Sequence, residues 1–529
     1  MVPLLIVAII AAYVVTSGVD MYKEEVLHLD PGYVYTEQDT VYLSSERIDT
    51  LNPVISDSID VYYLSQLIYS SLFVFDENLG VKPDLVDTYE INTEKAYIEI
   101  KLKKDILFHD GEELTASDVT FTINTMKAAG TSCPYYDKIK KINSAFTRSK
   151  YVVTIYFNNN YNCSLDDLVF PVINDSTYRT SYQFIAAKDN FKPIGTGQYR
   201  YRSYNSTKQL KLGPYKDYYG EKAKKNLIVT ILPDRELASN MMEIDSVTCY
   251  VDSTTSRKTI ASDKKLKVYD FASNNVEFIV FNTNAKYISS KEVRHALAYG
   301  INIEKILENS YMGDGILTDT IYYPNFLGVK DTLDYYDYNM INAMSLFESV
   351  GFSDKNTDGF LEDADGKTIE FSILVDKNNA TRNSAAKNIR ADLDQLGIKA
   401  NINALEGAEY ENAISNRKFD ILITGYTINE EYDLRSFFNG QSEWKYYNYE
   451  LFEMSRQLER LYTPEEYKEK YKELKTEMMD ALPYYPICYK QMSLIGVSTF
   501  EAGKLPMFNS ILKNCSTWKW SVVTEKNNE

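Results

Sequence analysis

Few residues in this sequence have the types and spacing that catalysis needs. The three histidines, His28, His109 and His295, lie too far apart along the chain to form a zinc site by spacing. No G-x-S-x-G or H-E-x-x-H motif occurs, so there is neither a nucleophile elbow nor a zinc-binding helix. His109 precedes the turn pair Asp110-Gly111, and we expect it to pack in that turn. The sequence therefore predicts a protein that is not an enzyme, although two carboxylates distant in the chain would still suit a hydrolase.

One acidic stretch has the spacing of a calcium-binding loop. In the twelve residues from Asp354 to Asp365, side-chain oxygens stand at positions 1, 3, 5, 9 and 12, and Gly359 stands at position 6. Asp365 replaces the usual bidentate glutamate, and a strand rather than a helix is expected to follow. The alternative is an acidic, solvent-exposed connection. The candidate ligands of a structural calcium ion are Asp354, Asn356, Asp358, Phe360, Glu362 and Asp365.

Strands and helices that alternate along the chain would hold these residues. Thr115 and Asp118 have the spacing of a capping box, and Pro464 after Thr463 marks the start of another helix. A third helix has an apolar stripe and ends at Gly397. This alternation predicts an α/β architecture. Strands are expected over residues 151–157, 277–282, 369–375, 398–405 and 420–426.

The size and charge of the chain limit the classes of protein to which it can belong. At 529 residues it is too long for one hydrophobic core, so several domains are expected. The formal net charge of −18 argues against nucleic acid or an anionic membrane surface as a partner. A hydrophobic content of 44% and a charged content of 25% are ordinary for a folded, soluble protein.

The first residues have the composition of a membrane segment. Residues 1–19 carry no charged side chain, and residues 4–15 are almost purely aliphatic. A helix of this length spans roughly 28 Å, close to the thickness of the hydrocarbon core of a bilayer. An uncleaved membrane anchor is our first interpretation and a cleaved signal our second, with residues 20–38 as a spacer. Both interpretations place the rest of the chain outside the cytoplasmic membrane.

The five cysteines allow two interpretations. Cys133 and Cys163, and likewise Cys488 and Cys515, are close enough in sequence for a disulfide bond that staples a loop in an oxidising compartment. Isolated buried thiols are the alternative. With Cys249 the count is odd, so at least one thiol stays free in either case.

A series of short motifs extends along nearly the whole chain. Among them are Leu51-Asn52-Pro53 and the stretch PIGTGQY at residues 193–199. Together, from about residue 40 to 520, they resemble the bacterial extracellular solute-binding proteins of the oligopeptide, dipeptide and nickel type. Arg294, in the last motif, is expected to pair with carboxylates rather than with a ligand. The motifs lie at residues 51–53, 67–72, 83–85, 107–119, 193–199, 212–220 and 281–299.

The resemblance implies an α/β clamshell with two lobes, a hinge and an extra subdomain on the first lobe. A ligand would be enclosed when the lobes close. The implied function is an extracytoplasmic receptor of an ABC importer, a monomer that captures oligopeptides and delivers them to the permease and ATPase subunits. No cofactor is expected beyond the candidate calcium ion. Lobe I would comprise residues 39–75, 191–282 and 489–529, the extra subdomain residues 76–190, and lobe II residues 283–488.

The resemblance also implies where the amine of a peptide binds. In peptide-binding members of the family, a Trp-x-x-Asp-like stretch follows a strand, and its carboxylate binds the free amine. Here Tyr426 holds the aromatic position, but Asn429 holds the acidic one. A shifted loop would give the role to a later carboxylate, which would form a charge-assisted hydrogen bond. The candidate binding residues are Tyr426, Thr427, Asn429, Glu430, Glu431 and Asp433.

Three other interpretations stay open from the sequence alone. A signalling receptor would use the same cleft to sense a peptide without importing it. A receptor of the same fold would alternatively bind an oligosaccharide or a chelated metal. An extracellular hydrolase has the least support, because the motifs that mark its chemistry are absent from the sequence.

Overall fold

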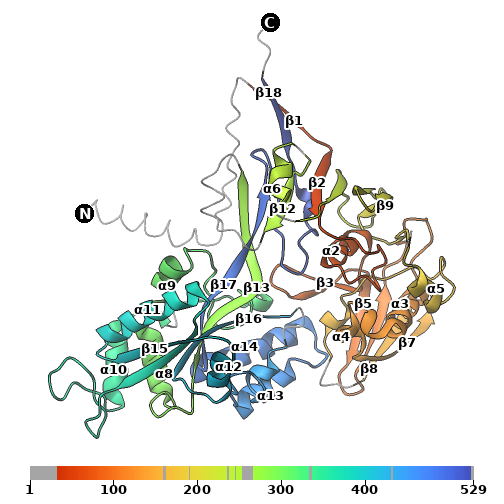
Figure 1. Ribbon diagram of the computed structural model, residues 1–529. Helices are drawn as coiled ribbons and strands as arrows, with labels where there is room; N and C mark the ends of the chain where they lie inside the picture. The colour runs from red at the N-terminus through yellow and green to blue at the C-terminus, as the bar shows by residue number, and fades with distance from the viewer. Residues whose placement is uncertain are drawn as a thin grey trace, which may run out of the picture.

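The computed structural model describes residues 33–158, 163–189, 191–234, 237–244, 246–252, 266–332, 336–429 and 433–525. Two lobes are joined by a pair of long strands, β13 (Lys267–Phe281) and β17 (Tyr484–Gly496), which Figure 1 shows at the centre of the molecule. The predicted α/β, periplasmic-binding-protein-like fold is confirmed. The predicted anchor, residues 1–19, lies outside the described residues. Within the described ranges, no helix is long and apolar enough to cross a bilayer.

The two long strands form the connection between the lobes. They pair antiparallel along most of their length, and the register shifts between Ala272 and Val276. On one side of the shift β17 pairs with β12 (Cys249–Asp252), and on the other side β13 pairs with β16 (Ile421–Thr427). One six-stranded sheet, ordered β12-β17-β13-β16-β14-β15, therefore runs from lobe I into lobe II. A bulge of this kind bends a strand locally, so it marks the hinge.

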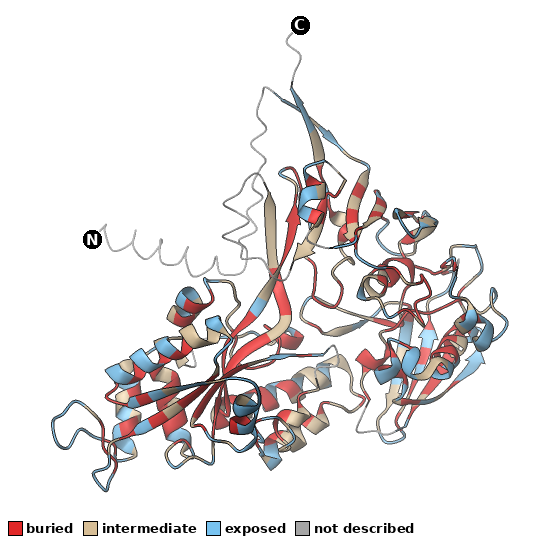
Figure 2. Ribbon diagram, in the orientation of Figure 1, coloured by how far each residue is buried: buried red, intermediate tan, exposed pale blue. Residues whose placement is uncertain are grey.

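Lobe II is an α/β body built on the second half of this sheet. β14 (Glu370–Asp376) pairs in parallel with β15 (Lys399–Leu405) and with β16, as expected for strands that helices connect. Buried residues concentrate on these strands and on the helix faces turned toward them, as Figure 2 shows. The helices of this lobe are α8 (Lys291–Gly300), α9 (Ile303–Ser310), α10 (Met340–Ser349), α11 (Ala380–Gln395), α12 (Gly407–Ser415), α13 (Tyr449–Gln457) and α14 (Pro464–Ala481).

Lobe I contains two further four-stranded sheets, ordered β2-β11-β10-β9 and β5-β6-β8-β7. The capping box predicted at Thr115 and Asp118 begins α3, which packs against β7. The two ends of the described chain meet in this lobe, because β1 pairs antiparallel with β18. The strands are β1 (Tyr33–Glu37), β2 (Thr40–Ser45), β3 (Phe73–Phe75), β4 (Val81–Pro83), β5 (Val86–Asn92), β6 (Tyr97–Leu102), β7 (Ile142–Ser149), β8 (Val152–Phe157), β9 (Tyr199–Asn205), β10 (Gln209–Pro214), β11 (Asn226–Ile231) and β18 (Ser521–Glu525). The helices are α2 (Ile59–Ile68), α3 (Ala116–Ala129), α4 (Tyr136–Ile139), α5 (Ser181–Ala186) and α6 (Leu237–Met242).

A second contact joins the lobes away from the long strands. The backbone N–H of Cys163 donates to the carbonyl of Glu459 at 2.8 Å, and the hydroxyl of Thr93 donates to the carbonyl of Leu461 at 3.0 Å. The N–H of Leu327 also donates to the carbonyl of Asn78 at 2.8 Å. These three hydrogen bonds connect the β3–β8 part of lobe I with lobe II.

The segment that holds Gly195 and Gly197 is packed directly onto the end of α2. The N–H of Gly197 donates to the carbonyl of Ile68 at 2.8 Å. His109 Nε2 lies 3.0 Å from the carbonyl of Gly197, and the N–H of Gly195 donates to His109 Nδ1 at 3.3 Å. Burial lowers the pKa of His109 to about 4, so the ring is neutral at pH 7. The interpretation of His109 as a packing histidine is confirmed.

The prediction that Arg294 pairs with carboxylates is wrong. Its guanidinium donates to the backbone carbonyls of Ile288, Ser289 and Ala481, at distances from 2.6 to 3.0 Å, and not to carboxylates. The reason is that α14 ends at Ala481, where carbonyls lose their helical partners and need donors. Arg294 therefore ties α8 to the end of α14.

The cysteines are isolated buried thiols, which was the second interpretation of the sequence. All five are free and buried, so neither loop staple is present. Burial raises the pKa of the Cys133 thiol to about 11 and that of the Cys163 thiol to about 12. Because the thiolate is the reactive form, these cysteines serve as small apolar residues of the core.

The contact at Gly195 leads to a test of the packing. A Cβ at Gly195 would lie under 3.0 Å from the backbone of Ile68 and from the ring of Tyr69. We expect Gly195→Ala to lower the free energy of unfolding, measured in urea, by about 3 kcal/mol, the upper part of the range for overpacking. In the control Gly366→Ala, the φ of +77° is strained but the space is open, so the loss should be about 1 kcal/mol. Equal losses in the two variants would contradict the packing argument.

Candidate functional site

A cavity of about 220 Å³ lies in lobe I. It is formed by one face of α2, by β3 and by residues 504–517, so distant parts of the chain meet there. Tyr62 and Tyr135 pack against each other on its wall with ring centroids 5.7 Å apart. Such rings supply large contact areas at low entropic cost. The aromatic residues that line the cavity are Tyr62, Tyr69, Phe75, Tyr135, Phe170 and Tyr218.

The segment 504–517 brings unsatisfied polar groups to this cavity. Asn509 and Ser510 are 3% and 7% exposed. Among the described residues, neither the side-chain oxygen of Asn509 nor the hydroxyl of Ser510 has a hydrogen-bond partner. Buried polar groups without partners are rare in folded proteins, and water or a polar ligand commonly satisfies them. The cavity is therefore suited to a polar solute with apolar parts. The sequence motifs did not point to these residues.

The predicted binding loop begins at the hinge. Tyr426 and Thr427 end β16, where Thr427 pairs with Asn275 of β13. The ring of Tyr426 is 40% exposed and meets the ring of Phe437 edge-on, at 4.9 Å between centroids. Asn429 is also exposed, whereas Glu430 and Glu431 lie outside the described residues. Three of the predicted binding residues are thus solvent-accessible next to the connection between the lobes.

Asp433 has a different environment from these exposed residues. Its carboxylate accepts hydrogen bonds from the guanidinium of Arg435 at 2.7 and 2.9 Å. Burial raises the pKa of Asp433, but the Arg435 hydrogen bonds and charge outweigh burial and hold it below the ordinary value. Arg435 also lies 2.7 Å from Glu459, and burial, with the nearby charge of Asp433, raises the pKa of Glu459 to about 8. Asp433 therefore already has a cationic partner within lobe II.

A buried charge cluster fixes the lobe II side of the hinge, and the sequence analysis missed it. Glu277 of β13 accepts two hydrogen bonds from Arg382 of α11, at 2.8 and 2.9 Å, and lies 3.1 Å from the ammonium of Lys490 of β17. The hydroxyl of Tyr311 donates to the same carboxylate at 3.1 Å. A Cβ at Gly425 would lie under 3.0 Å from both the Arg382 guanidinium and the Glu277 carboxylate, so a larger residue there would displace this ion pair. A lone glutamate in an apolar strand was the available signal, because such a charge needs a partner.

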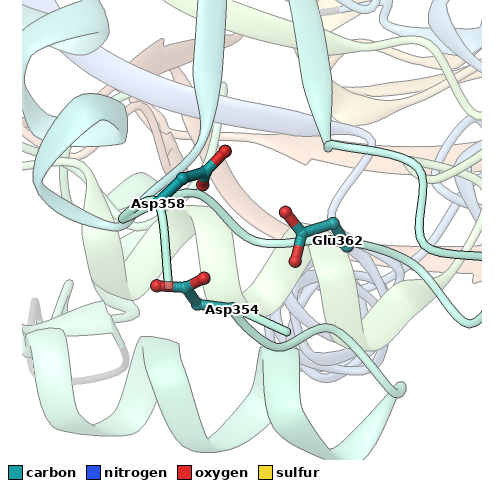
Figure 3. Close-up of side chains that lie close together, drawn as sticks. All are labelled: Asp354, Asp358 and Glu362. Carbon is teal, nitrogen blue, oxygen red and sulfur yellow. The ribbon is translucent and has the colours of Figure 1, made fainter. Parts of the chain in front are cut away.

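The predicted calcium loop brings three carboxylates together. Oxygens of Asp354, Asp358 and Glu362 all lie within 4.8 Å of one another, and Figure 3 shows the three side chains around one space. Gly359 has a φ of +89°, and its N–H donates to Asp354 at 3.0 Å, so the chain turns as the motif requires. These residues fit a hard cation that prefers oxygen ligands.

The other predicted calcium ligands are placed differently. The side-chain nitrogen of Asn356 donates to Glu362 at 3.0 Å, and the N–H of Phe360 donates to Asp358 at 2.9 Å. The N–H of Asp365 donates to Asp363 at 3.0 Å, and the Asp365 carboxylate is not part of the cluster. The convergent set is thus smaller than the set of six residues predicted from spacing.

Comparison with known proteins identifies the family. The model of the bacterial extracellular solute-binding proteins, family 5 Middle, matches residues 80–446. The chain belongs to this family. The oligopeptide-binding protein AppA of Bacillus subtilis is 24% identical over 446 residues, which cover 80% of this chain and 81% of that protein.

Solved structures of other proteins share the fold. The periplasmic murein tripeptide binding protein MppA, in its unliganded open form, matches with a TM-score of 0.73 and 13% identity, over 94% of this chain and all of that chain (100%). A nickel ABC transporter protein from Bacillus halodurans matches with a TM-score of 0.71 and 16% identity, over 92% of this chain and 100% of that chain.

Family membership confirms the resemblance seen in the sequence motifs. This family 5 protein is an extracytoplasmic, non-enzymatic solute-binding subunit of an ABC importer, of the oligopeptide, dipeptide and nickel type. The names of its relatives include different solutes, and identities near 20% do not determine which solute this chain binds.

The charge cluster at the hinge leads to a test of stability. Glu277→Ala removes the buried carboxylate that neutralises the half-buried Arg382, and a largely buried charge left without its partner costs about 3–5 kcal/mol. We expect a loss of that size in the free energy of unfolding in urea. In the matched control Lys377→Met, the exposed pair with Glu406 is broken, and the loss should stay below about 1 kcal/mol.

The same cluster predicts a pH dependence. Burial raises the pKa of Glu277, but hydrogen bonds and charges from Arg382 and Lys490 outweigh it and hold the pKa below the ordinary 4.5. A lowered pKa means that the stabilisation is present above pH 4.5 and is lost as the pH falls below it. The acid limb of the stability curve should therefore be shallower in Glu277→Ala than in the wild type. Parallel acid limbs would contradict this assignment.

Proposed function

We propose that this protein captures oligopeptides between its lobes and delivers them to the permease of its importer. The observation that carries the proposal is the cavity whose wall combines aromatic rings with buried polar groups that have no partner in the part of the chain that the structure describes. A peptide backbone supplies a donor and an acceptor at almost every residue, and aromatic rings tolerate varied side chains. The likeness to an oligopeptide-binding relative supports the same ligand class.

Capture depends on the hinge in this proposal. Bending at the register shift between Ala272 and Val276 brings the loop at Tyr426 toward lobe I and encloses the ligand. The receptor works as a monomer, held at the outer face of the membrane by residues 1–19.

A carboxylate of the binding loop holds the peptide amine. Asn429 has no charge, and Asp433 is already paired with Arg435. Glu430 and Glu431 are the remaining acidic residues that the loop pattern offers. A carboxylate that meets an ammonium in a closed cleft forms a charge-assisted hydrogen bond, available to a peptide of any sequence.

The test is a comparison of ligand classes by thermal shift and calorimetry. A library of tri- to pentapeptides should raise the melting temperature, whereas the N-acetylated library and oligosaccharides should not. The double variant Glu430→Gln/Glu431→Gln should bind the free library about tenfold more weakly or worse, because a hydrogen bond to a charged group is lost. The exposed Glu409→Gln of α12 is the matched control and should bind as the wild type does.

Three results would contradict parts of the proposed function. Stabilisation by oligosaccharides or by a metal chelate alone would replace the peptide by another solute. Equal binding of free and N-acetylated peptides would remove the amine contact. Peptide binding without import, in cells that contain the permease and the ATPase, would favour a sensing receptor.

We also propose that the loop 354–365 binds a structural calcium ion. Three converging carboxylates repel one another, and a divalent cation removes that repulsion. Calcium at 100 times its dissociation constant should stabilise the protein by about 2.7 kcal/mol. Asp358→Asn should abolish this effect, whereas Asp365→Asn should leave it. A calorimetric titration of the wild type that releases no heat, with an unchanged melting temperature, would refute the ion.

A further inference from the structure

Lys513 brings a positive charge to the wall of the lobe I cavity. Its ammonium donates to the carbonyl of Phe75 at 3.1 Å. An ammonium has three protons to donate, so this one bond leaves donor capacity for a ligand. Ser510, three residues earlier, lines the same cavity with a buried hydroxyl that has no partner among the described residues.

The charge of Lys513 has no direct counter-ion. Among the described residues, no carboxylate lies within 4.0 Å of its ammonium. Asp84 and Asp76 are the acids whose charges act on Lys513, and both have other partners: Asp84 accepts a hydrogen bond from the Tyr219 hydroxyl at 2.7 Å, and Asp76 accepts from the N–H groups of Asn78 and Gly80.

The pKa of Lys513 is lowered, as expected for a partly buried ammonium without an adjacent carboxylate. Burial lowers its pKa to about 8, the attraction of Asp84 opposes that shift, and the like charge of Lys82 adds to it. A partly buried cation without a partner is costly, and an anion placed beside it would recover that cost.

We propose that Lys513 and Ser510 bind the terminal carboxylate of the captured peptide. The proposal rests on the proposed function. A carboxylate there would accept charge-assisted bonds from the ammonium and a further bond from the Ser510 hydroxyl. The side-chain amide of Asn509, which also lines the cavity, supplies another donor.

This assignment sets the direction of the peptide. The carboxylate end lies in lobe I, and the amine end faces the loop after Tyr426 on lobe II. Each end of the ligand is then held by a different lobe, so binding energy from both termini favours the closed receptor. A peptide with one blocked end would therefore favour the closed receptor less strongly.

The experiment combines blocked ligands with variants of Lys513. The purified full chain is titrated calorimetrically with tri- to pentapeptide libraries that are free, C-amidated or N-acetylated. The wild type should bind the C-amidated library about tenfold more weakly than the free one. Lys513→Met should bind the free library with the same loss and should no longer distinguish it from the amidated library.

Two further variants separate a ligand contact from a structural role. Lys513→Arg keeps the positive charge, so it should keep the preference for the free carboxylate. The exposed Lys95→Met should behave as the wild type does. Above pH 8, Lys513 of the wild type loses its proton when no ligand is bound, so affinity for the free library should fall, and it should not fall in Lys513→Arg.

The outcomes distinguish this inference from the proposed function. Equal binding of the free and C-amidated libraries by the wild type would overturn the carboxylate site while leaving peptide capture intact. The same would follow if Lys513→Met still distinguished the two libraries. If no library bound, the proposed function itself would fail.

Discussion

The antiparallel pairing of β13 with β17 is the constraint on which the rest of the structure depends. Both lobes share these strands, whose register has its larger shift between Ala272 and Val276 and a second, smaller one between Glu277 and Phe278. A continuous ladder would hold the lobes rigidly in one arrangement, whereas a bulge concentrates bending at one place. The loop that follows β16 begins beside this bulge, since Thr427 pairs with Asn275. The hinge and the start of the proposed binding loop are thus one local structure.

Polar groups near the hinge fall into two classes. Glu277, Arg382 and Lys490 satisfy one another and tie β13 to α11 and β17 within lobe II. In the described part of lobe I, by contrast, the side-chain oxygens of Ser510 and Asn509 are buried without hydrogen-bond partners, and no carboxylate lies within 4.0 Å of the Lys513 ammonium. Unsatisfied groups destabilise a ligand-free protein. Their presence in one cavity is the physical reason to place the ligand there.

Local signals in the sequence predicted much of the fold. The capping box predicted at Thr115 and the helix start predicted at Thr463 both form, and five expected strands appear within a residue or two, apart from the start of β13. That strand begins ten residues earlier than expected, because its lobe I half contains polar residues and lacks a regular apolar pattern. Contacts between residues far apart in the chain could not be predicted from the sequence. Glu277 and Arg382 are 105 positions apart, and no local pattern connects them. Arg294 shows the same limit, since its partner at Ala481 depends on where another helix ends.

Closure of the lobes around a peptide is the central claim, and small-angle X-ray scattering tests it most directly. The radius of gyration of the purified receptor would be measured with and without a saturating library of free tri- to pentapeptides. The account predicts that the radius of gyration and the maximum dimension both decrease when peptide binds. Unchanged scattering from a receptor whose occupancy is confirmed by calorimetry would contradict capture by hinge closure.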